Sequence, residues 1–153
     1  MRLRFPEVEG RSLDDENVAL PGELEGDLNL LAVAFHRTQQ REVDTWVPLF
    51  RKLEGEVAGL AAYEIPTISG SWRPFRRFID GGMKAAIPDP LTRRRTVTVY
   101  GDVSRVTDGL GLADRERIAV VLCDREGGIG WMARGPLEGK PPEDLLEALG
   151  GGS

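Results

Sequence analysis

The sequence is poor in the residues that carry redox and metal chemistry, with one cysteine and one histidine in 153 residues. A single cysteine cannot form an internal disulfide, so nothing in the fold depends on an oxidising compartment. One thiol and one imidazole are also too few ligands for a structural zinc site. We therefore expect no metal and no cofactor.

Long apolar runs are also absent, because no hydrophobic stretch approaches the roughly 18 residues that a membrane-spanning helix needs. The N-terminal residues carry positive charge, but no apolar segment of a secretory signal follows them. With 41% hydrophobic and 29% charged residues, the composition is typical of a soluble globular protein. We expect a cytoplasmic protein that does not cross a membrane.

An excess of positive charge is missing too, since 20 Lys and Arg stand against 25 Asp and Glu, a net charge of −5. Nucleic-acid binding depends on clustered basic residues that neutralise phosphates, so we expect no nucleic-acid partner. Residues 71–95 depart from this balance, with seven basic and two acidic side chains. This basic segment is interpreted as a solvated face or, alternatively, as a docking patch for an acidic partner, a phosphate or an anionic membrane.

The hydrophobic pattern follows an α/β order. An extended or hairpin lead-in over residues 5–21 precedes an apolar run over 28–35, which is typical of a strand buried on both faces. From Glu42, apolar residues recur every three or four positions and predict an amphipathic helix. The patterns that follow predict a strand over 57–65 that stops at Pro66, a short helix over 72–83, a loop over 86–94, a strand over 96–100, a helix over 102–110, a hairpin over 118–133 and a helix from Pro141.

This length favours one domain, which we expect to span residues 1–149. Residues 1–27 form its N-terminal extension, and residues 150–153 are expected to be a flexible tail. The expected fold class is α/β, a three-layer sandwich with a central mixed sheet, helices on both faces and an N-terminal β extension.

Residues 35–48 resemble the active-site region of thioredoxin-like proteins, in which a phenylalanine ends a central strand, Cys-x-x-Cys opens the next helix and a proline lies one turn further on. The resemblance implies a thioredoxin-like fold. Without a gap, its two cysteine positions correspond to Gln40 and Val43. The peroxiredoxin pattern, with Thr38 as its threonine, places Arg41 at the peroxidatic cysteine. Neither pattern finds a thiol, so the resemblance implies a redox-inactive member of the superfamily.

A second set of motifs spans residues 28–135. It consists of Ala34-Phe35, Gln39-Gln40, Asp44-Thr45-Trp46, Tyr63-Glu64-Ile65-Pro66, Phe78-Ile79-Asp80, Tyr100-Gly101-Asp102 and the run from Leu122 to Trp131. These motifs resemble the Atp10-type family, thioredoxin-fold assembly factors for the membrane sector of mitochondrial ATP synthase. The resemblance implies a binding or assembly module whose partner is another protein. A membrane-associated partner and a homodimer both remain open.

Two surfaces are candidate binding sites. At the start of the predicted helix, backbone N–H groups carry partial positive charge and are bordered by His36, Arg37, Thr38, Gln39 and Gln40. This cluster would bind a carboxylate, a phosphate or a partner's backbone; the alternative is an ordinary polar helix start. The second surface is aromatic and basic and comprises Trp72, Arg73, Arg76 and Arg77.

The single thiol, Cys123, falls in the alternating pattern of a strand and is expected to be a small buried hydrophobe. Three functions follow from these patterns. The expected one is a redox-inactive binding or assembly module without catalytic residues. The alternatives are a divergent peroxiredoxin-like or thiol-disulfide oxidoreductase that uses Cys123, and a binder of a small anionic ligand.

Overall fold

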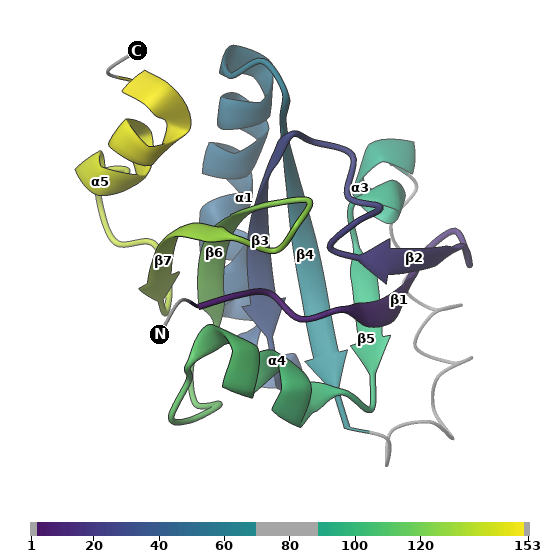
Figure 1. Ribbon diagram of the computed structural model, residues 1–153. Helices are drawn as coiled ribbons and strands as arrows, with labels where there is room; N and C mark the ends of the chain where they lie inside the picture. The colour runs from purple at the N-terminus through teal and green to yellow at the C-terminus, as the bar shows by residue number, and fades with distance from the viewer. Residues whose placement is uncertain (1–2, 70–88, 152–153) are drawn as a thin grey trace.

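The computed structural model describes residues 3–69 and 89–151, and within this range the strands form one mixed sheet in the order β2-β1-β5-β4-β3-β6-β7 (Figure 1). The strands are β1 (Val8–Ser12), β2 (Asn17–Leu20), β3 (Leu28–Ala34), β4 (Leu60–Ile68), β5 (Val97–Tyr100), β6 (Ala119–Asp124) and β7 (Ile129–Arg134). The helical segments are η1 (Arg37–Gln39), α1 (Gln40–Glu56), α3 (Pro90–Arg94), α4 (Val103–Leu110), α5 (Glu143–Leu146) and η3 (Glu147–Gly151).

Three parallel strands, β5, β4 and β3, form the middle of the sheet, and antiparallel strands extend it on both sides. The register of β3 with β4 runs from Leu28 opposite Leu60 to Ala34 opposite Pro66. Parallel neighbours need a long crossover connection, which α1 provides here. The expected α/β class with a central mixed sheet is therefore confirmed.

The two faces of β3 are buried in different clusters. Leu31 and Val33 pack on the side of α4, whereas Leu30 and Ala32 pack on the side of α1. Successive side chains of a strand point to opposite faces, so a nearly continuous apolar run is what a strand covered on both sides requires. Figure 1 shows α1 and α4 on opposite sides of the sheet, which gives the three layers that the sequence predicts.

Helix α1 is held to the sheet by the apolar stripe that the sequence predicts, and it begins two residues before Glu42. Val43, Phe50 and Leu53 are buried on this stripe. Trp46 is 2% exposed, and its indole nitrogen donates to the backbone oxygen of Gly135 at 3.0 Å. This bond ties α1 to the chain that leaves β7.

The N-terminal hairpin expected from the sequence is present as β1 and β2, and β1 joins the sheet beside β5. The outer border of β2 is partly closed by its own chain. The Ala19 N–H donates to the Glu23 carboxylate at 2.6 Å, and the Glu23 N–H donates to the Ala19 oxygen at 2.8 Å. Ala19 therefore presents no unpaired backbone group at this border.

Strand β4 does not stop at Pro66, and the expectation that it would was wrong. The strand continues to Ile68 because it pairs with β5 at Thr67 and Ile68 after β3 has ended. Pro66 does interrupt the pairing of β4 with β5, because the bridge between Glu64 and Thr96 is separate from the pairing at Thr67 and Ile68. A proline has no N–H to donate, so the ladder is interrupted while the strand direction persists.

The expectation of a loop over 86–94 was wrong for its last five residues, which form α3. Asp89 caps this helix by accepting the N–H groups of Leu91 and Thr92, and Pro90 occupies the first helical turn. The expected helix over 72–83 lies outside the described residues. The last turn extends to Gly151, and the remainder of the expected tail, residues 152 and 153, also lies outside them.

Candidate functional site

The candidate site lies where β3 ends and α1 begins, at the edge of the sheet toward which β3, β4 and β5 all run (Figure 1). Open α/β sheets bind ligands outside the carboxyl ends of their parallel strands. Phe35 closes the buried strand, His36 has an extended backbone with φ of −140°, and η1 then turns into α1. The chain thus places residues 36–40 together on this edge.

Gln39 is the buried member of these five residues, with 3% exposure. Its side-chain oxygen accepts the N–H groups of Phe35 at 2.8 Å and His36 at 3.3 Å. Its side-chain nitrogen donates to the backbone oxygen of Arg115 at 2.8 Å, in the loop that precedes β6. The side-chain amide of Gln39 therefore joins three segments of the chain, and these contacts leave it unavailable for binding a ligand.

Gln40 occupies the first cysteine position of the thioredoxin pattern and bridges two carboxylates. Its side-chain nitrogen donates to Asp44 at 2.9 Å and to Glu64 at 3.1 Å. Glu64 comes from β4, and burial raises its pKa; the hydrogen bond from Gln40 and the charge of Arg51 lower it, while Asp44 raises it. This cluster can hold a proton, but it contains no nucleophile for sulfur exchange.

Sequence reasoning did not select the two carboxylates that contact Gln40. The spacing of four residues between Gln40 and Asp44 was a usable signal, because such residues are neighbours on a helix surface. The signal for Glu64 was an acidic residue within an otherwise apolar strand. Its approach to Gln40 depends on the pairing of β4 with β3, which brings the two carboxyl ends to one edge.

His36, Arg37 and Thr38 are exposed at the same edge. Within the described part of the chain, the side chains of Arg37 and Thr38 form no hydrogen bond or ion pair. The structure therefore brings four of the five sequence-selected residues to the surface, namely these three and Gln40, and uses the fifth to hold the edge together.

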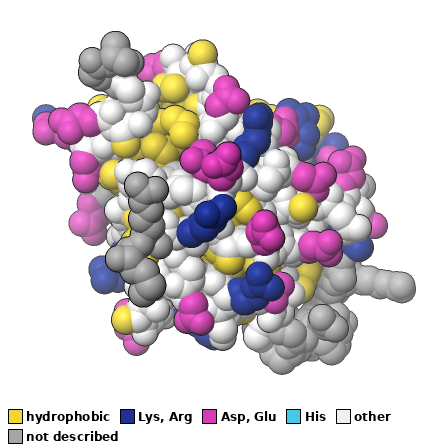
Figure 2. Space-filling view, viewed as in Figure 1, with side chains coloured by type: hydrophobic (Ala, Val, Ile, Leu, Met, Phe, Trp, Pro, Cys, Tyr) yellow, Lys and Arg dark blue, Asp and Glu magenta, His cyan; other side chains and the backbone are white. Residues whose placement is uncertain are grey.

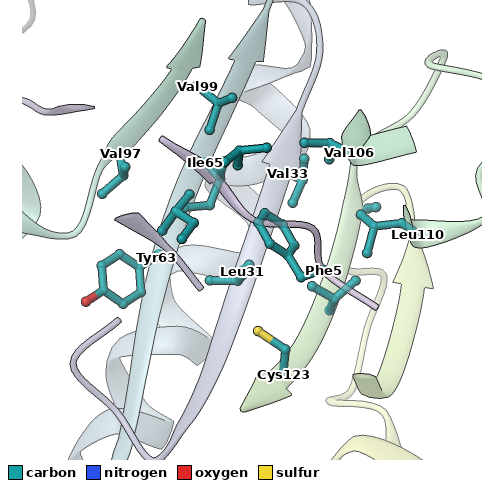
Figure 3. Close-up of a cluster of buried hydrophobic side chains, with 14 of the residues drawn as sticks. Phe5, Leu31, Val33, Tyr63, Ile65, Val97, Val99, Val106, Leu110 and Cys123 are labelled. Atoms are coloured by element: carbon teal, nitrogen blue, oxygen red, sulfur yellow. The ribbon is translucent and has the colours of Figure 1, made fainter. Parts of the chain in front are cut away.

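Neither the second cysteine position of the thioredoxin pattern nor the single cysteine of the chain provides a reactive thiol. Val43, at the second cysteine position, is 2% exposed and belongs to the core beneath α1. Cys123 is fully buried among Phe5, Leu31 and other apolar side chains (Figure 3). Burial, with a smaller contribution from the charge of the neighbouring Asp124, raises the pKa of its thiol to about 12.

The position of Cys123 also separates it from the candidate site. It pairs with Asn29 near the start of β3, six residues before Phe35. At about 3.3 Å per residue, the thiol lies roughly 20 Å along the strand from Phe35, after which the chain turns into η1 and α1. The sequence-based interpretation of Cys123 as a small buried hydrophobe is confirmed.

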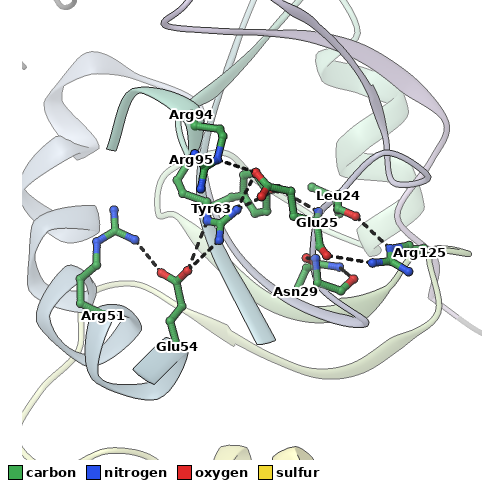
Figure 4. A network of polar contacts seen from close by, with 10 residues as sticks. Leu24, Glu25, Asn29, Arg51, Glu54, Tyr63, Arg94, Arg95 and Arg125 are labelled. Atoms are coloured by element: carbon green, nitrogen blue, oxygen red, sulfur yellow. Dashed lines mark hydrogen bonds and ion pairs between the residues drawn. The ribbon is translucent and has the colours of Figure 1, made fainter. Parts of the chain in front are cut away.

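The described part of the basic segment is neutralised within the chain. Arg93 pairs with Asp14 at 2.9 Å, and Arg94 pairs with Glu25 at 2.9 Å. Arg95 pairs with Glu25 at 2.7 Å and Glu54 at 3.2 Å, and its guanidinium lies over the Tyr63 ring (Figure 4). The three arginines therefore balance acidic side chains of the same chain. Of the three, Arg94 is exposed and Arg95 is buried, so the interpretation as a solvated face holds for only part of this segment. The second candidate surface, Trp72, Arg73, Arg76 and Arg77, lies outside the described residues.

The described ranges offer neither a metal cluster nor a helix that could span a membrane. Residues 3–69 and 89–151 contain no group of three or more His, Cys, Asp or Glu side chains that could hold a metal ion. In the same ranges, every helix is too short or too polar to cross a bilayer.

No protein-family model matches this chain, and no curated protein matches its sequence. Solved structures do match over nearly the whole length. A protein described as a putative electron transfer protein from Aquifex aeolicus VF5 shares 14% identity at a TM-score of 0.64, covering 97% of this chain and 96% of its own. BsSco, described as a member of the Sco family of cytochrome c oxidase assembly proteins, shares 14% identity at a TM-score of 0.64, covering 99% and 94%.

The thioredoxin domain of a thiol-disulfide oxidoreductase from Bacteroides vulgatus shares 21% identity at a TM-score of 0.56, covering 97% of this chain and 94% of its own. These similarities show the fold, and the chain has a thioredoxin-like fold with a seven-stranded mixed sheet. It carries this fold with one cysteine and without a Cys-x-x-Cys pair.

Proposed function

We propose that this protein is a redox-inactive thioredoxin-fold module that binds another protein and helps it to assemble. The observation that carries the proposal is that residues without a thiol occupy the two cysteine positions of the thioredoxin pattern. Gln40 is hydrogen-bonded to Asp44 and Glu64, and Val43 is part of the core. The scaffold therefore retains a shaped, polar edge at the end of β3 from which the atoms for disulfide exchange are missing.

The burial of Cys123 argues against the enzyme alternative. A thiol attacks peroxides and disulfides as the thiolate, and reactive cysteines are partly exposed in electropositive surroundings. Cys123 is fully buried among apolar side chains, and its pKa of about 12 keeps it protonated at neutral pH. A peroxidatic or disulfide-exchange step would need this residue to leave the core.

The assembly role is supported by two resemblances. The sequence motifs resemble Atp10-type assembly factors, and the structural neighbour BsSco is described as belonging to a family of cytochrome c oxidase assembly proteins. We propose that the exposed residues His36, Arg37 and Thr38 form the first contact surface for the partner. We further propose that Trp72, Arg73, Arg76 and Arg77 contribute a second one.

The contact surface can be tested by photo-crosslinking in the native cell. A benzoylphenylalanine at Thr38 is expected to form a covalent adduct with one partner protein. The control places the same group at Lys52, an exposed residue in the second half of α1. Adducts of equal pattern and yield from both positions, or no adduct from Thr38, would overturn the proposed contact surface.

The absence of thiol chemistry can be tested by restoring the two cysteines. With dithiothreitol as the electron donor, the wild-type protein is expected neither to accelerate insulin-disulfide reduction nor to turn over peroxide, whereas Gln40→Cys combined with Val43→Cys is expected to accelerate insulin-disulfide reduction. Each single variant is the control, because one cysteine cannot complete the exchange. Turnover by the wild type that is lost in Cys123→Ser would overturn the redox-inactive assignment.

A further inference from the structure

A third surface, distinct from the two proposed contact surfaces, lies at the opposite end of β3 from residues 36–40. An apolar groove of about 400 Å³ opens there, between the hairpin β6–β7 and the C-terminal helical segment. Its apolar lining comprises Leu3, Leu28, Leu122, Ile129 and Ala148. In Figure 2 this region appears as a yellow area beside the C-terminal segment, with magenta acidic side chains next to it.

One of the large exposed hydrophobic residues of the described chain belongs to this groove. Leu3 is 39% exposed and lines it. Leu146, at 41%, is not part of the lining, because residues two positions apart on a helix point to different sides and Ala148 is the one that lines the groove. An exposed apolar side chain at the rim of a groove is available to a binding partner.

Gly130 keeps the groove open although the fold does not need a glycine there. It is the extra residue of a bulge, since Leu122 pairs with Trp131 and Cys123 pairs with Ile129. A Cβ at Gly130 would meet no atom closer than 3.9 Å. Gly127 in the same hairpin differs, because it has φ of +90° and a Cβ there would lie 2.6 Å from the Phe5 oxygen.

Acidic side chains lie on one side of the apolar lining. Asp124 lines the groove itself, where its carboxylate also accepts the N–H groups of Glu126 and Gly128. The exposed residues Asp144 and Glu147 lie within one helical turn of Ala148, and the basic side chain of Arg4 lies beside the hairpin at Gly127. None of the three carboxylates forms an ion pair with a residue that the structure describes. The adjacent Asp27 is paired only loosely, with Arg125 at 3.4 Å. The groove therefore offers an apolar floor with an acidic rim.

We propose that this groove docks a basic amphipathic segment of another protein, with an apolar side chain as the anchor and Lys or Arg side chains on the acidic rim. Opposite charges at a rim guide and orient association, while the buried anchor supplies most of the affinity. A second copy of this chain fits less well, because a two-fold contact would set the acidic rim against itself. The inference goes beyond the proposed function and does not depend on residues 36–40.

Fluorescence anisotropy with a short labelled peptide of alternating lysine and leucine tests this docking. The wild type is expected to bind it at least about tenfold more tightly than the glutamate-leucine and lysine-alanine counterparts. Gly130→Leu, which fills the groove, is expected to weaken binding by at least about tenfold. Gly22→Leu adds the same side chain where no atom lies within 4 Å and is expected to bind like the wild type.

A second variant keeps the test independent of folding effects at Gly130. Asp144→Lys combined with Glu147→Lys changes only exposed residues, and it is expected to weaken binding of the lysine-leucine peptide and to reduce its salt dependence. Unchanged binding in both the groove-filling and the charge-reversed proteins would overturn the proposal. So would a dimer, seen by analytical ultracentrifugation, that Gly130→Leu abolishes, because the groove would then be a self-interface.

Discussion

The side-chain nitrogen of Gln39 lies 2.8 Å from the backbone oxygen of Arg115, a residue 76 positions away in the sequence. This contact joins the start of α1 to the loop before β6. The same side chain accepts the N–H groups of Phe35 and His36. One buried amide therefore fixes the geometry of the edge where the proposed contact surface lies.

Replacing Gln39 by alanine is expected to lower the free energy of unfolding by about 1–3 kcal/mol. The variant leaves the buried N–H of Phe35, the partly buried N–H of His36 and the carbonyl of Arg115 without their partner, and an unsatisfied buried group costs roughly this amount. Urea denaturation monitored by tryptophan fluorescence measures the change. The control is Gln40→Ala on the exposed neighbour, and a loss of similar size there would contradict the assigned role of Gln39.

Cys123 is expected to make stability fall with pH in alkaline solution. The folded thiol keeps its proton up to about pH 12, whereas the unfolded thiol loses it near 9.0. Between these values the unfolded state binds fewer protons, so this residue lowers the free energy of unfolding by up to about 1.4 kcal/mol per pH unit. Its stabilising contribution is complete below pH 9 and disappears toward pH 12.

The measurement compares urea unfolding of the wild type and Cys123→Ala from pH 8 to alkaline pH. Other titrating groups contribute equally to both proteins, so the difference between their stabilities isolates the thiol. We expect the wild type to lose stability more steeply than the variant. Parallel curves, or rapid labelling of the native thiol by Ellman's reagent at neutral pH, would show that Cys123 is accessible.

Glu64→Gln is expected to stabilise the protein slightly at neutral pH, by less than about 1 kcal/mol because the side chain is only half-buried. Burial raises the pKa of Glu64, so its ionised form is the one disfavoured in the folded state. The contribution of Glu64 is therefore fully present below its unfolded pKa and is lost as pH rises through the raised folded pKa. Urea unfolding at pH 4 and pH 7 should show the advantage of the variant only at the higher pH.

Arg95→Met is expected to destabilise the fold by about 1.5–3 kcal/mol, the usual contribution of hydrogen bonds to charged groups. Arg95 is 9% exposed, and its removal breaks its contacts with Glu25 and Glu54, although Glu25 keeps Arg94 and Glu54 keeps Arg51. The control is Arg94→Met, because Arg94 is about half exposed and surface pairs contribute at most about 1 kcal/mol. Equal losses in thermal or urea unfolding would contradict a special role for Arg95.

Local patterns in the sequence predicted much of the architecture. The apolar run of β3, the periodic stripe of α1 and the hairpin β6–β7 each contain their signal within one segment, and the structure confirms them. Helix α3 was missed although its signal was local. Asp89 followed by Pro90 is a favourable start for a helix, but prolines over this stretch were interpreted as a loop.

The details of the site depend on contacts between distant segments. The burial of Gln39 requires the loop at Arg115, and the carboxylate cluster requires β4 to bring Glu64 beside Gln40. The pairing of Arg93 and Arg95 with Asp14, Glu25 and Glu54 likewise crosses long stretches of chain. Residue types alone identify these groups as polar, and only the topology decides which of them meet.

The partly closed border of β2 has a consequence for how the protein behaves at high concentration. Edge strands with unpaired N–H and C=O groups recruit strands of other molecules and so begin aggregates. At Ala19 both groups are already bonded to Glu23. A strand of another molecule that paired at Ala19 would first have to break the two hydrogen bonds with Glu23. The turn after β2 therefore disfavours fibril growth from this edge of the sheet.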